Sequence, residues 1–320
     1  MSVIETHELT KHYNSFPALD GVTLEIPKGI TGIVGANGAG KTTLLKILLG
    51  ITAPTSGSAS IFGEEIGSPQ VRQLIGYMSE LDSFFPDVSA KKFIAHLGQM
   101  SGLPRTAALQ RAHDILQFVG LGEERHRKIQ TFSKGMLQKM KLGQALVHSP
   151  KLLLLDEPTD GLDPEGRARM LRLTKKLHDE GINILISTHI LPDIQRTAGH
   201  LVVIHKGKLL LSNNLSHILQ RFERKLVGEF EVRDKTTLHE FTTTLSGKGF
   251  QVRPLQHNRY EIVMPNGSDL DYESVHQAAI ENNIHINSLA RHTFTLDEAF
   301  IDMFSEDTGF RTGLVPGRGA

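Results

Sequence analysis

The stretch "GITGIVGANGAGKTTLLKILLG", residues 29–50, decides the fold of this chain. It opens with a short apolar run, continues through a turn rich in glycine and ends with helical periodicity. This order is typical of a phosphate-binding loop, in which a buried strand leads through glycines into the first turn of a helix. The alternative is a chance Gly-rich turn, and the strand and helix predicted on either side favour the phosphate-binding loop.

The chemistry of this loop follows from its residue types. Glycines let backbone N–H groups point into one concavity, where they and the helix N-terminus bind phosphate groups. Lys41 adds a positive charge for the β- and γ-phosphates, and the Thr42 hydroxyl is a ligand for Mg²⁺. The predicted nucleotide-binding residues of the loop are Gly35, Asn37, Gly38, Ala39, Gly40, Lys41, Thr42 and Thr43.

A second motif, "LLLLDEPTDGLDP" at residues 152–164, supplies the other half of a hydrolytic site. Asp156 ends a predicted buried strand and is well placed to hold Mg²⁺ through its water shell. Glu157 beside it can reach a water in line with the γ-phosphate and act as general base. An acidic pair at a surface strand end is common by itself, but the phosphate-binding loop earlier in the chain favours the hydrolytic role.

Short apolar runs alternate with helical patterns from Val3 to about Gln220, which predicts an α/β unit built around a largely parallel sheet. Continuous apolar runs read as central strands that are buried on both faces. Residues of about 88–150 lack such runs and predict a helical subdomain within a core of residues 1–221. The four predicted central strands lie at residues 29–35, 151–156, 183–188 and 201–205.

After this core the pattern of the sequence changes. Strand-like and helix-like stretches follow in the order β-α-β-β-α-β, with "IHINSLAR" as the last strand, which predicts a small ferredoxin-like α+β domain at residues 222–305. Residues 306–320 are predicted to be a frayed tail.

The composition excludes several classes of protein. A chain of 320 residues is expected to form two units. Lys plus Arg (35) balance Asp plus Glu (35), so no general positive field attracts nucleic acid. The absence of Cys rules out disulfides and thiolate metal sites and fits a reducing cytoplasm. No run approaches the roughly 18 apolar residues that cross a bilayer, so we expect a soluble chain.

The stretch "FSKGM", residues 132–136, has two interpretations. Taken alone, it is a helix start with Ser133 as the cap. Taken with the two motifs above, it completes an order of motifs that resembles the ATP-binding subunits of ABC transporters, from residue 3 to about 215. In that family the matching signature loop, usually LSGGQ, caps the ATP held by the opposed subunit. Ser133 and Gly135 match its serine and second glycine, whereas Lys134 and Met136 depart from it.

The resemblance implies a P-loop NTPase core of the ABC ATPase type, with ATP and Mg²⁺ as cofactors. It places Tyr13 against adenine, and it makes His189 the switch histidine that contacts the γ-phosphate and orients the attacking water. It also places Asp163 in the loop that crosses the dimer interface. Each has a plainer alternative: Tyr13 as a structural edge residue, His189 as an isolated histidine, and Asp163 as the helix cap before Pro164.

One residue departs from the family at an important position. Glu80 stands where the family usually has a Gln that contacts Mg²⁺ and the attacking water. A carboxylate and an amide have similar shapes and both offer an oxygen to Mg²⁺, so we assign Glu80 a catalytic and metal-binding role. The alternative is that Glu80 turns into solvent or pairs with a base. Phe84 and Phe85, which follow, belong either to the groove for a membrane subunit's coupling helix or to the helical core.

The function implied by the resemblance is a Mg²⁺-dependent ATPase subunit. It would form a homodimer around two ATP molecules and drive a separate integral-membrane permease from the cytoplasmic face of the membrane. "HTFTLDEAFIDMF", residues 292–304, is similar to the last helix of ABC-2 exporter ATPases and favours export. The alternatives are an ABC-type ATPase acting on nucleic acid or the ribosome without a permease, and an ATPase gated by a ligand of its C-terminal domain. A single phosphate-binding loop argues against the former, and the cargo is not encoded.

Overall fold

The computed structural model describes residues 2–82, 84–222, 225–231, 235–254, 259–263, 272–291 and 296. The chain divides into two compact units, Met1–Leu215 and Ser216–Ala320. The domain limits predicted from the sequence, with a boundary near residue 222, stay predictions.

A six-stranded sheet forms the centre of the first unit, in the order β10-β9-β3-β8-β7-β6. The strands from β9 to β6 in this order pair in parallel, and β10 pairs antiparallel at the edge. All residues of β3 and β7 are buried, as expected for parallel strands covered on both faces. The prediction of a largely parallel sheet is confirmed. The strands are β3 (Ile30–Val34), β6 (Ile75–Met78), β7 (Leu152–Asp156), β8 (Asn183–Thr188), β9 (His200–His205) and β10 (Lys208–Asn214).

The register of this sheet brings the predicted motifs together. Val34, which ends β3, pairs with Thr188 at the end of β8, and Asp156 pairs with Ser187. The loops that follow these parallel strands therefore leave from the same edge of the sheet. In open α/β sheets ligands bind in the crevice outside the carboxyl ends of the strands, and the phosphate-binding loop begins at this edge.

A second, antiparallel sheet has the order β2-β1-β4-β5. It shares one hydrophobic core with the central sheet, in which Ile4 and Leu24 of the second sheet, Leu44 and Leu48 of helix α1 (Lys41–Leu48) and Leu154 of β7 belong to one cluster. Burying each large aliphatic side chain contributes about 1.5–3 kcal/mol, so α1 is anchored directly behind the phosphate-binding loop. The strands of this sheet are β1 (Ser2–Tyr13), β2 (Phe16–Pro27), β4 (Ser56–Ile61) and β5 (Glu64–Glu65).

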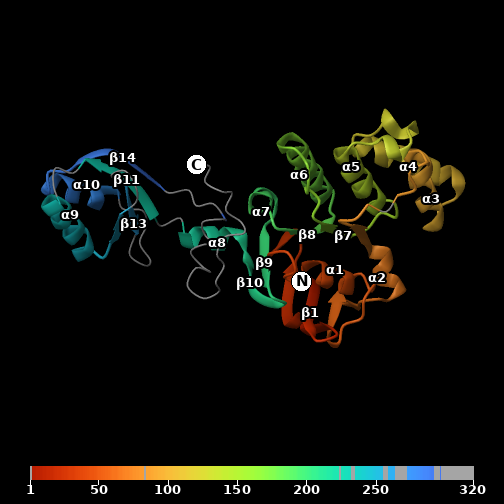
Figure 1. Cartoon of the computed structure of the whole chain (residues 1–320), viewed down its shortest axis with the longest axis horizontal. Helices are drawn as coiled ribbons and strands as arrows, with labels where there is room; N and C mark the ends of the chain where they lie inside the picture. The colour runs from red at the N-terminus through yellow and green to blue at the C-terminus, as the bar shows by residue number, and fades with distance from the viewer. Residues whose placement is uncertain are drawn as a thin grey trace. The chain divides into compact units, whose positions relative to one another are not determined.

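Helices α3, α4 and α5 form one group within the first unit (Figure 1). Within the described residues 84–150 no named strand occurs, and Ser89 and Lys128 form an isolated bridge. Gly143 on α5 allows close packing, because a Cβ there would lie 3.0 Å from the Ile115 side chain of α4. The helices of the unit are α2 (Pro69–Leu74), α3 (Ala90–Met100), α4 (Arg105–Phe118), α5 (Lys134–Ala145), α6 (Pro164–Asp179) and α7 (Leu191–Thr197), with short 3-10 helices at Glu124–His126 and Ile129–Thr131.

The second unit contains an antiparallel sheet in the order β12-β13-β11-β14. Its core is aromatic and aliphatic: the ring of Phe230 lies 5.1 Å from that of Phe241 and 5.7 Å from that of Tyr260. The assignment of this unit as ferredoxin-like stays a prediction. Its elements are β11 (Lys225–Glu231), α9 (Lys235–Gly247), β12 (Gln251–Pro254), β13 (Arg259–Val263), α10 (Tyr272–Glu281) and β14 (His285–Arg291), after α8 (Leu215–Phe222) at the division between the units.

Two predictions fall on other parts of the chain. The exporter-like stretch at residues 292–304 lies outside the described residues except for Leu296, which is buried. The predicted tail at residues 306–320 also lies outside them.

Candidate functional site

The loop between β3 and α1 has a backbone that only glycine fits. Gly40, the residue before α1, has a φ of 111°, and a Cβ there would lie 2.5 Å from the carbonyl oxygen of Ala18. No side chain caps the N-terminus of α1. The first N–H groups of a helix have no intrahelical acceptor, so those of α1 remain available for an anion. This geometry fits a polyphosphate.

The loop opens into a pocket that collects side chains from distant parts of the sequence. Eleven of the residues predicted to bind nucleotide or to catalyse line this pocket, while Ser133, Gly135 and Asp163 do not. Gly35 and Asp156, also predicted, are absent from the lining. The complete lining is Tyr13, Phe16, Ala18, Asn37, Gly38, Ala39, Gly40, Lys41, Thr42, Thr43, Glu80, Glu157, Asp160 and His189.

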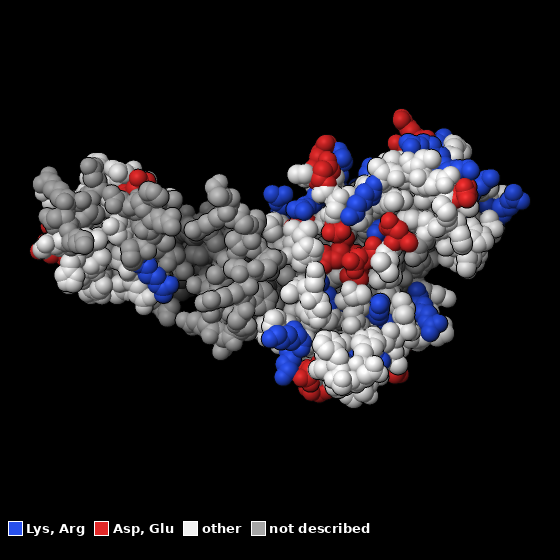
Figure 2. All heavy atoms as spheres, viewed as in Figure 1, with Lys and Arg blue, Asp and Glu red and all other residues white. Residues whose placement is uncertain are grey.

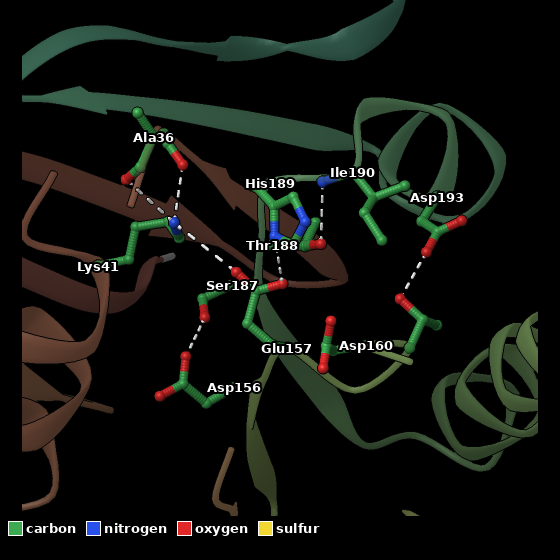
Figure 3. A network of polar contacts seen from close by, with 12 residues as sticks. Ala36, Lys41, Asp156, Glu157, Asp160, Ser187, Thr188, His189, Ile190 and Asp193 are labelled. Atoms are coloured by element: carbon green, nitrogen blue, oxygen red, sulfur yellow. Dashed lines mark hydrogen bonds and ion pairs between the residues drawn. The ribbon is translucent and has the colours of Figure 1, made fainter. Parts of the chain in front are cut away.

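Lys41 is a buried cation at the base of this pocket, with 6% of its surface exposed. Its Nζ donates hydrogen bonds to the carbonyl oxygens of Gly35 at 2.7 Å and Ala36 at 3.3 Å, and lies 3.7 Å from Oε1 of Glu157 (Figure 3). A buried ammonium group is tolerated only when it is paired in this way. The loop thus holds a fixed positive charge where the sequence predicted the phosphate groups.

Glu157 is held in an unusual backbone conformation. Its φ is 47°, in the left-handed region, which costs a non-glycine residue of order 1–3 kcal/mol and persists only when surrounding contacts fix it. Two contacts do so: its N–H donates to the carbonyl oxygen of Ser187 at 2.9 Å, and its Oε2 lies 3.0 Å from Nδ1 of His189. Lys41 and His189 therefore approach the two oxygens of one carboxylate (Figure 3).

Asp156, next to Glu157, is buried and surrounded by hydroxyl groups. Thr42 Oγ1 lies 3.4 Å from its Oδ1, Tyr77 OH lies 3.5 Å from its Oδ2, and Ser187 Oγ also donates to it. Burial, together with the charge of Asp156, raises the pKa of Tyr77 to about 12, so its phenol stays a neutral donor at physiological pH. Asp156 is thereby fixed beside Thr42.

Hard oxygen ligands are what Mg²⁺ prefers, and Thr42, Asp156 and Glu80 provide them at this edge of the sheet. Within the described part of the chain, no group of three or more His, Asp or Glu side chains forms a metal cage. Magnesium commonly binds through one or two carboxylates plus substrate phosphates. The donor set therefore fits a metal ion that arrives with a nucleotide.

A buried hydrogen bond joins the segment after Glu157 to helix α7. Thr159 Oγ1 donates to Oδ2 of Asp193 at 2.6 Å, and both side chains are buried. Burial raises the pKa of Asp193, while the Thr159 hydrogen bond and the nearby charge of Arg167 act against this rise. The chain after β7 and the chain after β8 are thus connected twice, at Glu157 and at Thr159.

Glu80 lies in the lining of the pocket. Its carbonyl oxygen accepts a hydrogen bond from Lys141 Nζ at 2.8 Å. Among the described residues no hydrogen bond or ion pair involves its carboxylate, so the alternative of pairing with a base is not what the structure has. Glu80 is exposed, so its carboxylate is accessible from solvent as well as from the pocket.

The stretch "FSKGM" does form a helix start. Ser133 caps α5 by accepting a hydrogen bond from the N–H of Met136 at 3.4 Å, and it is exposed. Lys134 forms an ion pair with Asp160 at 3.2 Å, and both side chains are exposed. Asp163 likewise caps α6, accepting from the N–H of Gly166 at 2.9 Å. A role of Ser133 and Asp163 in binding nucleotide, beside this capping, stays a prediction.

Sequence reasoning missed Phe16, Ala18 and Asp160, which also line the pocket. Phe16 pairs with Tyr13 across a tight hairpin, and the two rings are 60% and 45% exposed. The stretch "YNSF" at residues 13–16 carried the signal, because two aromatics around a two-residue turn lie opposite each other in a hairpin. A pair of exposed rings at the pocket mouth offers stacking surface to a base.

The two aromatics after Glu80, Phe84 and Phe85, were predicted to belong either to a groove for a coupling helix or to the helical core. Both Phe84 and Phe85 pack edge-to-face on the buried Phe93, with centroids 5.5 Å and 6.1 Å away. Phe85 is nevertheless 63% exposed. One of its faces thus contributes to the helical core while much of its surface remains accessible.

Known proteins share this arrangement. The family profile described as ABC transporter matches residues 19–160. The bacitracin transport ATP-binding protein BcrA of Bacillus licheniformis is 32% identical over 311 residues, which cover 96% of this chain and 99% of that protein. The chain belongs to the ABC transporter ATP-binding proteins. The Nod factor export ATP-binding protein I of Cupriavidus metallidurans is 34% identical over 210 residues, covering 65% of this ABC ATPase and 69% of that protein.

A solved structure agrees with the fold of this ABC ATPase. The structure of cbiO1 from Clostridium perfringens, part of the ABC transporter complex cbiONQ, has a TM-score of 0.63 at 27% identity. The match covers 69% of this chain and 92% of cbiO1. The predicted P-loop ABC ATPase core is confirmed, and membership of the family means that the chain binds and hydrolyses ATP.

These relatives favour a transport role over action on nucleic acid or the ribosome. The charge distribution agrees: on the face in Figure 2, basic side chains of the first unit are scattered around a central acidic group, with no continuous basic surface over its described part. No helix in the described part of the chain is long and apolar enough to cross a membrane.

Proposed function

We propose that this ABC ATPase hydrolyses Mg·ATP as a homodimer and drives a separate integral-membrane permease, as an exporter, from the cytoplasmic face of the membrane. The observation that carries the chemical part is the grouping of Lys41, Glu157 and His189 at one pocket, with Asp156 and Thr42 directly beside them. This arrangement combines a phosphate-binding cation, a candidate base and a candidate metal site.

Each of these residues has a task that its position supports. Lys41 and the N–H groups at the start of α1 hold the β- and γ-phosphates, and Thr42, Asp156 and Glu80 would hold Mg²⁺. Bound Mg²⁺ supplies charge neutralisation at the phosphate oxygens. Glu157 accepts a proton from the attacking water through its carboxylate, while His189 orients that carboxylate through the Nδ1 contact.

The rings of Tyr13 and Phe16 at the mouth of the pocket provide stacking surface for adenine. This extends the role that the family resemblance gives to Tyr13 alone. Both rings are exposed, so neither has to leave a packed core to meet a base.

The second proposal concerns the dimer. Ser133, Gly135 and Asp163 lie outside the lining of their own pocket, and Ser133 stands exposed at a helix N-terminus, which favours anions. They are therefore suited to contact the γ-phosphate of ATP held by a second copy. The same argument does not apply to Glu80, which lines its own chain's pocket.

A mixing experiment tests the trans arrangement. Lys41→Ala chains and Ser133→Arg chains should each be inactive alone and should recover part of the ATPase rate when mixed, because a heterodimer has one intact composite site. Loss of ATP binding by the Ser133→Arg monomer would contradict the trans role, and nucleotide titration of each variant by itself measures this.

Coupling to a permease and export are supported by the relatives, which include proteins of bacitracin transport and Nod factor export. Because these two cargoes differ chemically, the relatives support the mode of action and leave the cargo open. Purification of the tagged chain from membranes should recover an integral-membrane protein in a fixed ratio, and ATP hydrolysis in reconstituted vesicles should move its cargo outward. Recovery from the soluble fraction alone would contradict the proposal.

The hypothesis that the C-terminal domain senses a small molecule stays a prediction. A ligand screen on residues 222–305, followed by ATPase assays of the full chain with each hit, tests it directly.

A further inference from the structure

Lys141 is a second buried cation of the first unit, with 5% of its side chain exposed. It belongs to α5, and its Nζ reaches the segment that follows β6. There it donates to the carbonyl oxygen of Glu80 at 2.8 Å and forms an ion pair with Asp82 Oδ1 at 3.1 Å. Removing an ammonium group from water is costly unless it is paired, so Lys141 and residues 80–82 hold each other in place.

The segment held by Lys141 carries a residue of the nucleotide pocket. Residues 79–82 have no helix or strand structure, and Glu80 lines the pocket with Lys41 and Glu157. No hydrogen bond or ion pair of the Glu80 carboxylate occurs among the described residues. The hydrogen bond from Lys141 therefore acts on the backbone of the segment that carries this carboxylate.

The same cation lies on the helix that begins at the signature loop. Ser133 caps α5, and Lys141 is eight residues further on, about 12 Å along the axis at 1.5 Å per residue. A displacement of residues 80–82 therefore has a direct mechanical connection to the helix that presents Ser133.

We propose that Lys141 is a positioning residue: through its contacts with Glu80 and Asp82 it holds the segment that carries Glu80 at the nucleotide pocket. The inference rests on the proposed metal-binding role of Glu80. It concerns the two contacts that Lys141 makes with the segment of Glu80 and Asp82, one with a carbonyl oxygen and one with a carboxylate.

The first test measures position directly, without nucleotide. Lys141→Met keeps the length and burial of the side chain but removes its charge and donor. Amide hydrogen exchange of residues 79–82 should accelerate in this variant, because a segment that loses its tie opens more often. Lys139→Met is the matched control on the same helix: its Nζ contacts the carbonyl oxygen of Gly120 at 3.2 Å, and residues 79–82 should exchange as in the unmodified chain.

The second test measures the consequence at the pocket. ATP affinity is titrated with Mg²⁺ and with chelator, and the ratio of the two is compared among variants. Glu80→Gln should strengthen metal-free binding more than Mg·ATP binding, because it removes a negative charge beside the phosphates. Lys141→Met should change the ratio in the same direction by roughly 3- to 10-fold, the size expected when a typical hydrogen bond of a protein is lost.

The double variant separates positioning from general damage. If Lys141 acts through Glu80, adding Lys141→Met to Glu80→Gln leaves the ratio unchanged, whereas independent effects multiply. Asp82→Asn, which keeps the carbonyl contact, should cause a smaller change than Lys141→Met. Circular dichroism and thermal unfolding confirm that each variant is folded.

The outcomes separate this inference from the proposed function. Unchanged exchange of residues 79–82 in Lys141→Met, or an equal effect in both backgrounds, overturns the positioning role. An unchanged ratio in Glu80→Gln overturns the metal role of Glu80, and with it the coupling to the pocket, while ATPase activity dependent on Glu157 would still stand.

Discussion

The two units of this chain differ in what they bury. In the first unit, charged side chains including Lys41, Lys141, Asp156, Glu157 and Asp193 are buried. In the described part of the second unit, the buried residues are hydrophobic or glycine, and its core is built on Phe230 and its neighbours. Buried charge is costly, so it is kept where chemistry needs it. The contrast shows that, among the described residues, the buried charged side chains lie in the first unit, which also contains the nucleotide pocket.

The largest effect is expected from Glu157→Gln, which tests the catalytic role of the first unit. Glu157→Gln keeps the shape of the side chain but removes its ability to accept a proton, and general-base catalysis contributes about 10²- to 10⁴-fold in rate. ATP turnover should fall by that factor while ATP binding is retained and the protein accumulates as a dimer. Steady-state assays and size-exclusion chromatography with ATP measure both. Near-normal turnover would remove Glu157 from this role.

The opposite behaviour is expected in the second unit. Phe230→Ala empties the centre of its aromatic core, and such truncations cost about 3–5 kcal/mol in free energy of unfolding. Since the nucleotide pocket is lined entirely by the first unit, the affinity for ATP should stay within about twofold. Denaturant unfolding followed by nucleotide titration measures the two quantities. A loss of ATP affinity in Phe230→Ala protein that is still folded would contradict this separation of stability and nucleotide binding between the two units.

An intermediate effect is expected from Thr159→Val, which tests a buried hydrogen bond within the first unit. Thr159→Val removes only the hydroxyl that donates to Asp193, and leaving a buried carboxylate without its donor costs about 1–3 kcal/mol. If this tie supports the strained backbone of Glu157, kcat should fall roughly 5- to 100-fold with little change in KM.

Thr174→Val is the matched control for that variant. Thr174 is equally buried, but its hydroxyl donates to the carbonyl oxygen of Met170, one turn earlier in α6. We expect its kcat to be unchanged. If Thr159→Val and Thr174→Val lose the same stability and neither alters kcat, the tie to Asp193 is structural only.

The smallest effect comes from Tyr77. Tyr77→Phe removes a weak 3.5 Å contact to Asp156, and the ATPase rate should fall less than about fivefold. The folded-state pKa of about 12 lies above the ordinary value of 10, so the stability that depends on the neutral phenol is present below pH 10 and is lost between pH 10 and 12. Urea unfolding across this range should show a shallower decline for Tyr77→Phe. An identical decline in both proteins would contradict the raised pKa.

The local motifs could be predicted because they depend on residues that are neighbours in the chain. Lys41 and Thr42 follow glycines that permit one backbone path, and Asp156 ends an apolar run long enough for a central strand. The α/β class followed from the alternation of such runs with helical patterns. Even the helix start at Ser133 was readable, since a serine before a helical run is a common cap.

The sequence by itself thus determined the fold class, the phosphate-binding loop and the acidic pair, because periodicity and short motifs encode local backbone geometry. The contacts that join distant segments depend on the tertiary structure: Thr159 with Asp193, and Lys141 with Glu80 and Asp82. Each of these depends on sheet register or helix packing, which places side chains within 3 Å or so of one another only after the whole unit has assembled. From the sequence, Lys141 in its helical pattern would be interpreted as a solvated residue. Its contacts follow only from the packing of α5.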